Sequence, residues 1–91
     1  MTVMIDDVTL TAGTWVNVNT LSSIAATSAM EIQNKGSHYI LLTKKATKPA
    51  DSYRGGKVVD VLYTATVDAD VSAVPLWAYS PIDCPLCIQA S

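Results

Sequence analysis

Few side chains in this sequence could do chemistry, and the most obvious are Cys84 and Cys87. Their Cys-x-x-Cys spacing occurs both in thiol redox enzymes and in zinc sites. A redox pair has its first thiolate at a helix N-terminus, and the residues after Cys87 are too few to form a helix. A structural zinc needs about four ligands, and the chain adds only His38, which is distant. We therefore expect two incidental thiols, with a zinc or disulfide shared with a neighbouring subunit, or redox activity, as alternatives.

The remaining candidates for chemistry have simpler interpretations. His38 is the single histidine, so we expect it to be structural or exposed. The serines lack a pattern of histidine and acid partners, and the glycines form no phosphate-binding motif. Asp68, Asp70 and Asp83 could meet around a cation, but without a fuller loop of oxygen ligands they are better explained as turn formers. The sequence therefore predicts no catalytic residue, metal site or cofactor, and no enzyme.

Two groups of side chains are better suited to contacting a partner. The first contains large aromatic rings on predicted strands, which could stack on sugars but could equally form the core or a subunit interface in a chain without Phe. The second combines basic residues with a tyrosine in the predicted loop 44–56; it could meet an acidic surface or a phosphate, although a solvated loop is the simpler interpretation. The possible interface residues from both groups are Trp15, Trp77, Tyr79, Lys44, Lys45, Tyr53 and Arg54.

The length and composition predict one small domain, residues 1–91, with a thin core. A chain of this size buries only about 60–65% of the surface that it exposes when unfolded. Charged residues make up 15% of the chain and apolar residues 49%, with a mean hydropathy of +0.27. An ordinary soluble domain has about 25% charged residues. We therefore expect another subunit to cover part of the outer surface.

The charge argues against some classes of partner. The formal net charge is −2 and the sequence pI is about 4.9, which disfavours nucleic acid as the main partner. No apolar run approaches the roughly 20 residues of a membrane span. The stretch Met1–Asp7 does not resemble a signal peptide, so we expect synthesis in a reducing cytoplasm where the cysteines stay as thiols.

The spacing of apolar residues has a period of two, which predicts strands rather than helices. Strands are expected over 8–11 and 15–18, separated by a break at Ala12-Gly13, and 21–29 is expected to be a loop with room for a helical turn. Residues 30–33 and 37–43 are predicted to form a hairpin, because Asn34-Lys35 suits a type I turn and Gly36 suits the left-handed position that closes it.

The second half of the chain follows the same pattern. Residues 44–56 are polar and end in a glycine pair, which predicts the longest exposed connection. Residues 57–67 alternate best, and we expect one half-buried strand with Val59, Val61, Tyr63, Ala65 and Val67 on one face. Further strands are expected over 75–79 and 86–90. The fold class is thus all-β: a small β-sandwich or barrel of about seven short antiparallel strands.

Three segments together resemble small bacteriophage virion proteins. They are Leu10–Val18, which contains Leu-Thr-Ala-Gly-Thr before a strand, Ala29–Ser37, which contains Ile-Gln-Asn-Lys-Gly, and the aromatic strand Pro75–Tyr79. The resemblance spans most of the chain and implies a head decoration, head-fibre or tail-collar subunit built on a β-sandwich, usually multimeric and often trimeric. Cys84 and Cys87 match no role in that family.

The resulting hypothesis is a non-enzymatic structural component of a phage particle that acts by oligomerising and docking. Its expected partners are copies of itself and other virion proteins, such as the major capsid or tail proteins. Its expected location is the virion, assembled in the host cytoplasm. A carbohydrate- or receptor-binding module is the first alternative and requires exposed aromatic rings. A zinc or thiol protein that uses the C-terminal cysteines is the second.

Overall fold

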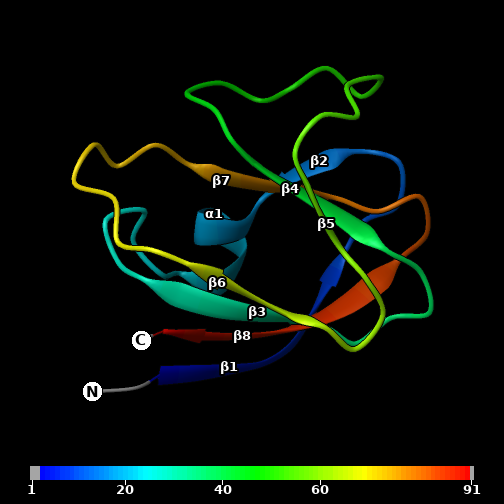
Figure 1. Ribbon diagram of the computed structural model, residues 1–91, viewed down its shortest axis with the longest axis horizontal. Coiled ribbons are helices and arrows are strands. Elements are labelled where there is room, and N and C mark those ends of the chain that lie inside the picture. Colours follow the sequence, from blue (N-terminus) through cyan, green and yellow to red (C-terminus); the bar gives the residue numbers. More distant parts are fainter. Residues whose placement is uncertain (1–2, 91) are drawn as a thin grey trace.

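The computed structural model describes residues 3–90, and the side chains of residues 8–90, as two facing antiparallel sheets (Figure 1). One sheet has the strand order β1-β8-β3-β6 and the other β2-β7-β4-β5. The all-β, sandwich-like class is therefore confirmed, and residues 1, 2 and 91 of the predicted domain lie outside the described residues. The strands are β1 (Val3–Leu10), β2 (Trp15–Asn17), β3 (Met30–Asn34), β4 (Ile40–Lys44), β5 (Lys57–Val59), β6 (Thr64–Val67), β7 (Leu76–Tyr79) and β8 (Cys84–Ala90).

The main core lies between the sheets and follows from strand alternation. On β8, Cys84, Leu86 and Ile88 are fully buried while the residues between them are partly exposed. β3 contributes Ile32 and β4 contributes Ile40 from the opposite sheet, and both are also fully buried. Side chains of alternate residues point to opposite faces of a strand, so each sheet contributes one apolar face to the core.

The short helix α1 (Val18–Ser22) replaces the predicted end of the second strand. Asn17 caps it, because its side-chain oxygen accepts a 3.0 Å hydrogen bond from the Thr20 amide. Ser23 ends it in a left-handed conformation, with φ of 61°. Helix α1 is far too short to cross a membrane, and the structure places no spanning helix anywhere in its described residues.

The predicted hairpin across residues 30–43 is wrong. β3 pairs with β6 and β8, whereas β4 pairs with β5 and β7, so the intervening residues carry the chain from one sheet to the other. Gly36 does not adopt the left-handed conformation that the prediction assigned to it. A Cβ atom at Gly36 would lie 2.5 Å from the Cys84 Sγ atom, so glycine is needed here for close packing.

The predicted single strand over 57–67 is also wrong. It is divided into β5 and β6, which belong to different sheets. Between them, Asp60 forms a turn: its carbonyl accepts from the Tyr63 amide at 3.1 Å and its side chain accepts from the Val61 amide at 2.8 Å. Leu62 adopts a left-handed φ of 66°. Tyr63, predicted on the buried face, is 69% exposed as a result.

The fully buried Asn34 holds both of these crossings in place. Its side-chain amide nitrogen donates to the carbonyl oxygens of His38 at 2.8 Å and Val59 at 3.0 Å. Its backbone amide donates to the Tyr63 carbonyl at 3.0 Å, and its carbonyl accepts from the Leu62 amide at 2.8 Å. A buried amide is tolerated when its hydrogen-bonding groups are paired. Asn34 thus links the two segments that cross between the sheets, at the place where the hairpin was predicted.

Candidate functional site

Most of the predicted interface residues converge on the outer face of the β2-β7-β4-β5 sheet. Trp15 on β2 lies opposite Tyr79 on β7, and both pack with Leu41 of β4 in a second buried cluster. Tyr53 and Trp77 pack against this cluster and are half-buried. We call these five residues the outer cluster. Trp15, Leu41, Trp77 and Tyr79 lie on strands, and alternation directs their side chains away from the main core.

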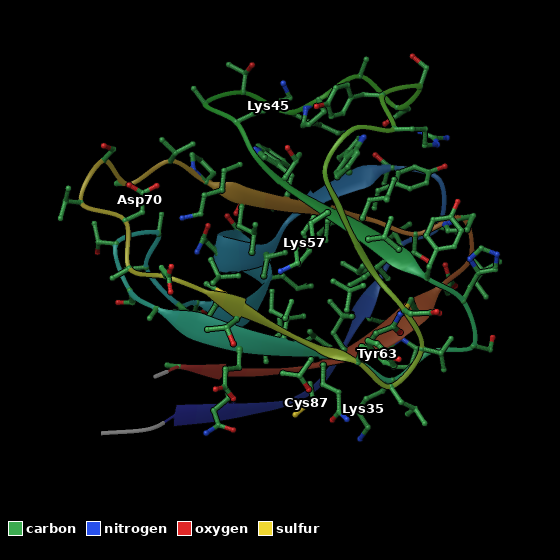
Figure 2. All side chains as sticks on the ribbon, in the orientation of Figure 1. Lys35, Lys45, Lys57, Tyr63, Asp70 and Cys87 are labelled. Carbon is green, nitrogen blue, oxygen red and sulfur yellow. The ribbon has the colours of Figure 1, made fainter. Side chains whose placement is uncertain are left out.

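The loop 45–56 covers the outer cluster, and two indole groups fasten it to the sheet. Trp15 Nε1 donates to the Tyr53 carbonyl at 3.2 Å, and Trp77 Nε1 donates to the Lys45 carbonyl at 2.9 Å. The Trp15 ring centroid lies 5.8 Å from that of Tyr53 and 5.5 Å from that of Tyr79. Figure 2 shows Lys45 within this loop, beside the sheet. The predicted exposed connection is therefore packed on one side.

The basic side chains of the loop contact the same rings. The Arg54 guanidinium carbon lies 4.0 Å from the Tyr79 ring centroid, and Arg54 also donates to the Tyr79 hydroxyl at 2.7 Å. It donates as well to the carbonyls of Asp51 and Tyr53. The Lys45 ammonium lies 4.6 Å above the Tyr53 ring. The Arg54–Tyr79 contact joins the loop to the sheet, and the Lys45–Tyr53 contact lies within the loop.

Lys44 is the one predicted interface residue that lies elsewhere. Its register partner on β7 is Leu76, a core residue, so Lys44 leaves β4 on the inner side of the sheet. Its ammonium lies 3.2 Å from the Asp70 carboxylate. The structure therefore brings together six of the seven predicted residues, and it does so as intramolecular packing.

This packing limits what the aromatic residues can bind. Trp15 is 2% exposed and Tyr79 is 5% exposed, so neither offers a ring face to a sugar. Only Trp77 and Tyr53 retain part of their surface. The geometry thus argues against a carbohydrate site built on Trp15 or Tyr79.

The two cysteines lie on opposite faces of β8, because an odd spacing on a strand reverses the side-chain direction. Cys84 is buried in the core and its thiol donates to the Asn34 side-chain oxygen at 3.3 Å, and burial raises the pKa of that thiol. Cys87 points outward (Figure 2), and both thiols are free. Two ligands that diverge in this way cannot share a metal ion or form a bond to each other.

Of the predicted turn aspartates, Asp70 caps a local turn, whereas Asp83 joins two parts of the chain that are distant in sequence. Asp70 accepts from the Ser72 amide at 2.9 Å, and Asp83 accepts from the Ala12 amide at 2.9 Å. The Ser72 hydrogen bond first, and then Lys44, hold the pKa of the Asp70 carboxyl below its usual value of 3.8. Within residues 8–90, no three His, Cys, Asp or Glu side chains gather in a group that could hold a metal ion.

A surface that the sequence did not reveal lies where the chain crosses from β5 to β6. Val58 is 59% exposed, Leu62 66% and Tyr63 69%, and Tyr39, at the start of neighbouring β4, is 36% exposed. We call these four residues the crossing patch. Period-two alternation assigned Tyr63 to the buried face, so only the turn at Asp60 could have signalled this patch.

Comparisons of the chain with protein-family models, curated proteins and solved structures find no match.

Proposed function

We propose that this chain is a non-enzymatic structural subunit of a bacteriophage particle, which assembles with copies of itself and docks on other virion proteins. The observation that carries the assembly part of the proposal is the crossing patch. Large apolar side chains that stay exposed on a small domain are favoured contacts for another protein chain. The bacteriophage setting, the virion location and the capsid or tail partners rest on the sequence resemblance.

Leu62 supports a docking role because its backbone conformation and its exposure both make leucine an unfavourable residue at this position. A branched side chain in the left-handed region is strained, by about 1–2 kcal/mol. The same side chain is 66% exposed, so packing within the chain does not repay that strain. Asn34 holds the strained backbone through the Leu62 amide. Because the backbone is already fixed, little further backbone entropy is lost when a partner covers the side chain.

Assembly on a symmetric particle also explains how a patch this small could suffice. Each copy contributes a few apolar contacts, and copies linked in one oligomer bind with a high effective concentration. The low charge of the chain suits such a role, since a charged rim would oppose close contact between identical subunits.

The solution mass of the protein, measured by light scattering, tests the assembly part. We expect a closed oligomer that is indifferent to reducing agent, since the crossing patch contains no cysteine. The variants Leu62→Gly and Leu62→Asn should lower the mass, because both residue types tolerate a left-handed φ and neither presents a large apolar side chain. Leu62→Gly should not lower the unfolding temperature, because it removes strain.

Val71→Ser is the matched control, because Val71 is 97% exposed but lies outside the crossing patch. It should leave the mass unchanged. A wild-type monomer at all concentrations, or an oligomer that Leu62→Gly does not weaken, would count against the crossing patch. Mass spectrometry of particles from a phage that encodes the chain tests the virion assignment separately, and its absence from them would remove that assignment.

A further inference from the structure

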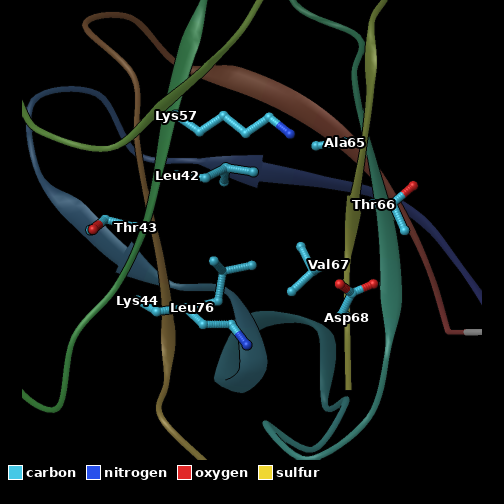
Figure 3. A pocket seen from close by; sticks show the side chains of 9 residues that line it. All are labelled: Leu42, Thr43, Lys44, Lys57, Ala65, Thr66, Val67, Asp68 and Leu76. Carbon is cyan, nitrogen blue, oxygen red and sulfur yellow. The ribbon is translucent and has the colours of Figure 1, made fainter. Parts of the chain in front are cut away.

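A cavity of about 310 Å³ opens between the sheets on the side where the edge strands β5 and β6 lie (Figure 3). Its floor is apolar: Leu42, Leu76 and Ala65 are buried core residues, and half-buried Val67 forms part of the wall. Volumes of 300 Å³ and above, with mostly apolar lining and a few polar groups, are typical of small-molecule sites. The cavity is thus large enough for an apolar chain of a few carbons.

Lys57 brings a cation to this apolar cavity. It pairs in register with Leu42, so both side chains leave their strands on the inner face. Figure 3 shows Lys57 extending across the cavity toward Ala65 on β6. Within the described residues, the Lys57 ammonium has no hydrogen bond or ion pair, whereas that of Lys44 is paired with Asp70.

The charges of the cavity are arranged along its length. In Figure 3, Lys57 lies at one end, and Lys44 and Asp68 lie toward the other. The exposed carboxylate of Asp68 repels an anion from its own end. A ligand with one negative charge therefore has a single favourable orientation, with its charge at Lys57 and its apolar chain over the floor.

We propose that this cavity binds a small amphipathic carboxylate, with the carboxylate on the Lys57 ammonium and the aliphatic chain against Leu42, Val67 and Leu76. The proposal is independent of the assembly role, because the crossing patch shares no residue with the cavity lining. An inward-pointing lysine on an edge strand also discourages strand pairing at that edge. A bound carboxylate would neutralise the charge of Lys57 without adding another strand to the edge of the sheet.

A series of butanoate, hexanoate and octanoate, titrated into the isotopically labelled protein and followed by NMR, tests the proposal. We expect saturable shifts at Leu42, Val67 and Leu76, and an affinity that rises about fourfold per methylene until the cavity is full. Hexan-1-ol should bind up to about fivefold more weakly than hexanoate, the range of a solvent-exposed ion pair. Hexylammonium should bind more weakly still.

Charge reversal gives the decisive comparison. Lys57→Glu should invert the preference, so that hexylammonium binds better than hexanoate, a result that unfolding could not mimic. Lys48→Glu, an exposed change in the loop 45–56, is the control and should keep the wild-type order. An unchanged preference in Lys57→Glu would overturn the proposal. So would the absence of saturable shifts at the floor residues with octanoate, or equal binding of all three chain lengths.

Discussion

The outer faces of the two sheets differ sharply in what covers them. The β2-β7-β4-β5 sheet carries the outer cluster, which the loop 45–56 covers. On the β1-β8-β3-β6 sheet, the described outer side chains of β3 and β8 are instead polar or small, among them Glu31, Gln33 and Gln89, and they stay partly or fully exposed. The outer face of the β2-β7-β4-β5 sheet is therefore a second small core, whereas the described outer face of the other sheet is in contact with solvent.

This difference changes how the composition is interpreted. A high apolar fraction and a low charged fraction predicted that another subunit covers part of the surface. The structure shows that the chain's own loop covers part of that apolar material, since Trp15 and Tyr79 are buried beneath it. A large aromatic ring buries about 150–250 Å², so even two rings account for a substantial area. The large apolar side chains that stay exposed include those of the crossing patch, together with Val71 and Ile82.

The largest effect on this comparison should come from Trp15→Ala, which removes the centre of the covered face. We expect a loss of about 3–5 kcal/mol in the free energy of unfolding, because a buried ring and its indole hydrogen bond are both lost. Chemical denaturation measures it. Glu31→Ala on the uncovered face should change stability by less than about 0.5 kcal/mol, because the Glu31 side chain is exposed. If Trp15→Ala fails to fold, Trp15→Phe should give an intermediate loss in the free energy of unfolding. Equal losses for the variants on the two faces would contradict the distinction between a covered and an uncovered face.

The next largest effect should separate the two faces of β8. Thiol alkylation at neutral pH should modify Cys87 roughly a hundredfold faster than Cys84, because Cys84 reacts only when the core opens locally. Burial also raises the pKa of Cys84, which lowers the fraction present as thiolate. Kinetics measured with Cys87→Ser should show only the slow phase, and Cys84→Ser only the fast one. Two thiols of similar reactivity would contradict the assigned strand register.

A smaller effect should follow from loosening the loop at its basic contact. Arg54→Ala removes the cation–π contact with Tyr79 and the hydrogen bond to its hydroxyl, and should cost about 1 kcal/mol. Hydrogen exchange should show increased opening of the loop 45–56, with β3 and β8 unaffected. Lys48→Ala is the matched control, since Lys48 only approaches Asp51 at 4.0 Å. Similar exchange in both variants would show that Arg54 does not hold the loop.

The smallest effect concerns pH and the turn at Asp70. Its pKa is lower in the folded chain than in the unfolded one, so its contribution to stability is present above the unfolded value of about 3.8 and is lost as pH falls through the lower folded value. Thermal unfolding should be measured between about pH 5 and pH 2, a range that spans the pKa of an aspartate. The wild-type protein should lose a small amount of stability as the pH falls, and the Asp70→Asn variant should lack this loss. Identical pH profiles for the two proteins would show that Asp70 makes no such contribution.

Local pattern was sufficient to predict the class of fold and the position of most strands. Alternation placed strands at 15–18 and 75–79, close to the observed β2 and β7, and it directed Trp15 and Val16 to opposite faces. The residue types also identified the aromatic members of the outer cluster and the basic residues of loop 45–56 that contact them. They did not show that these residues contact one another, because loop 45–56 is brought onto the sheet by contacts that are distant in sequence.

What only the tertiary structure decided is which strand pairs with which. Both wrong predictions, the hairpin at 34–36 and the single strand over 57–67, assumed that neighbours in sequence belong to the same sheet. Alternation records which face of a strand is buried but not which sheet it joins, so it continues unchanged through a crossing. Asn34 stabilises both crossings, because its buried amide groups need hydrogen-bond partners. It finds them at Val59, Leu62 and Tyr63, which only folding brings near it. The same crossings expose Leu62 and Tyr63 and leave the cavity open beside Lys57.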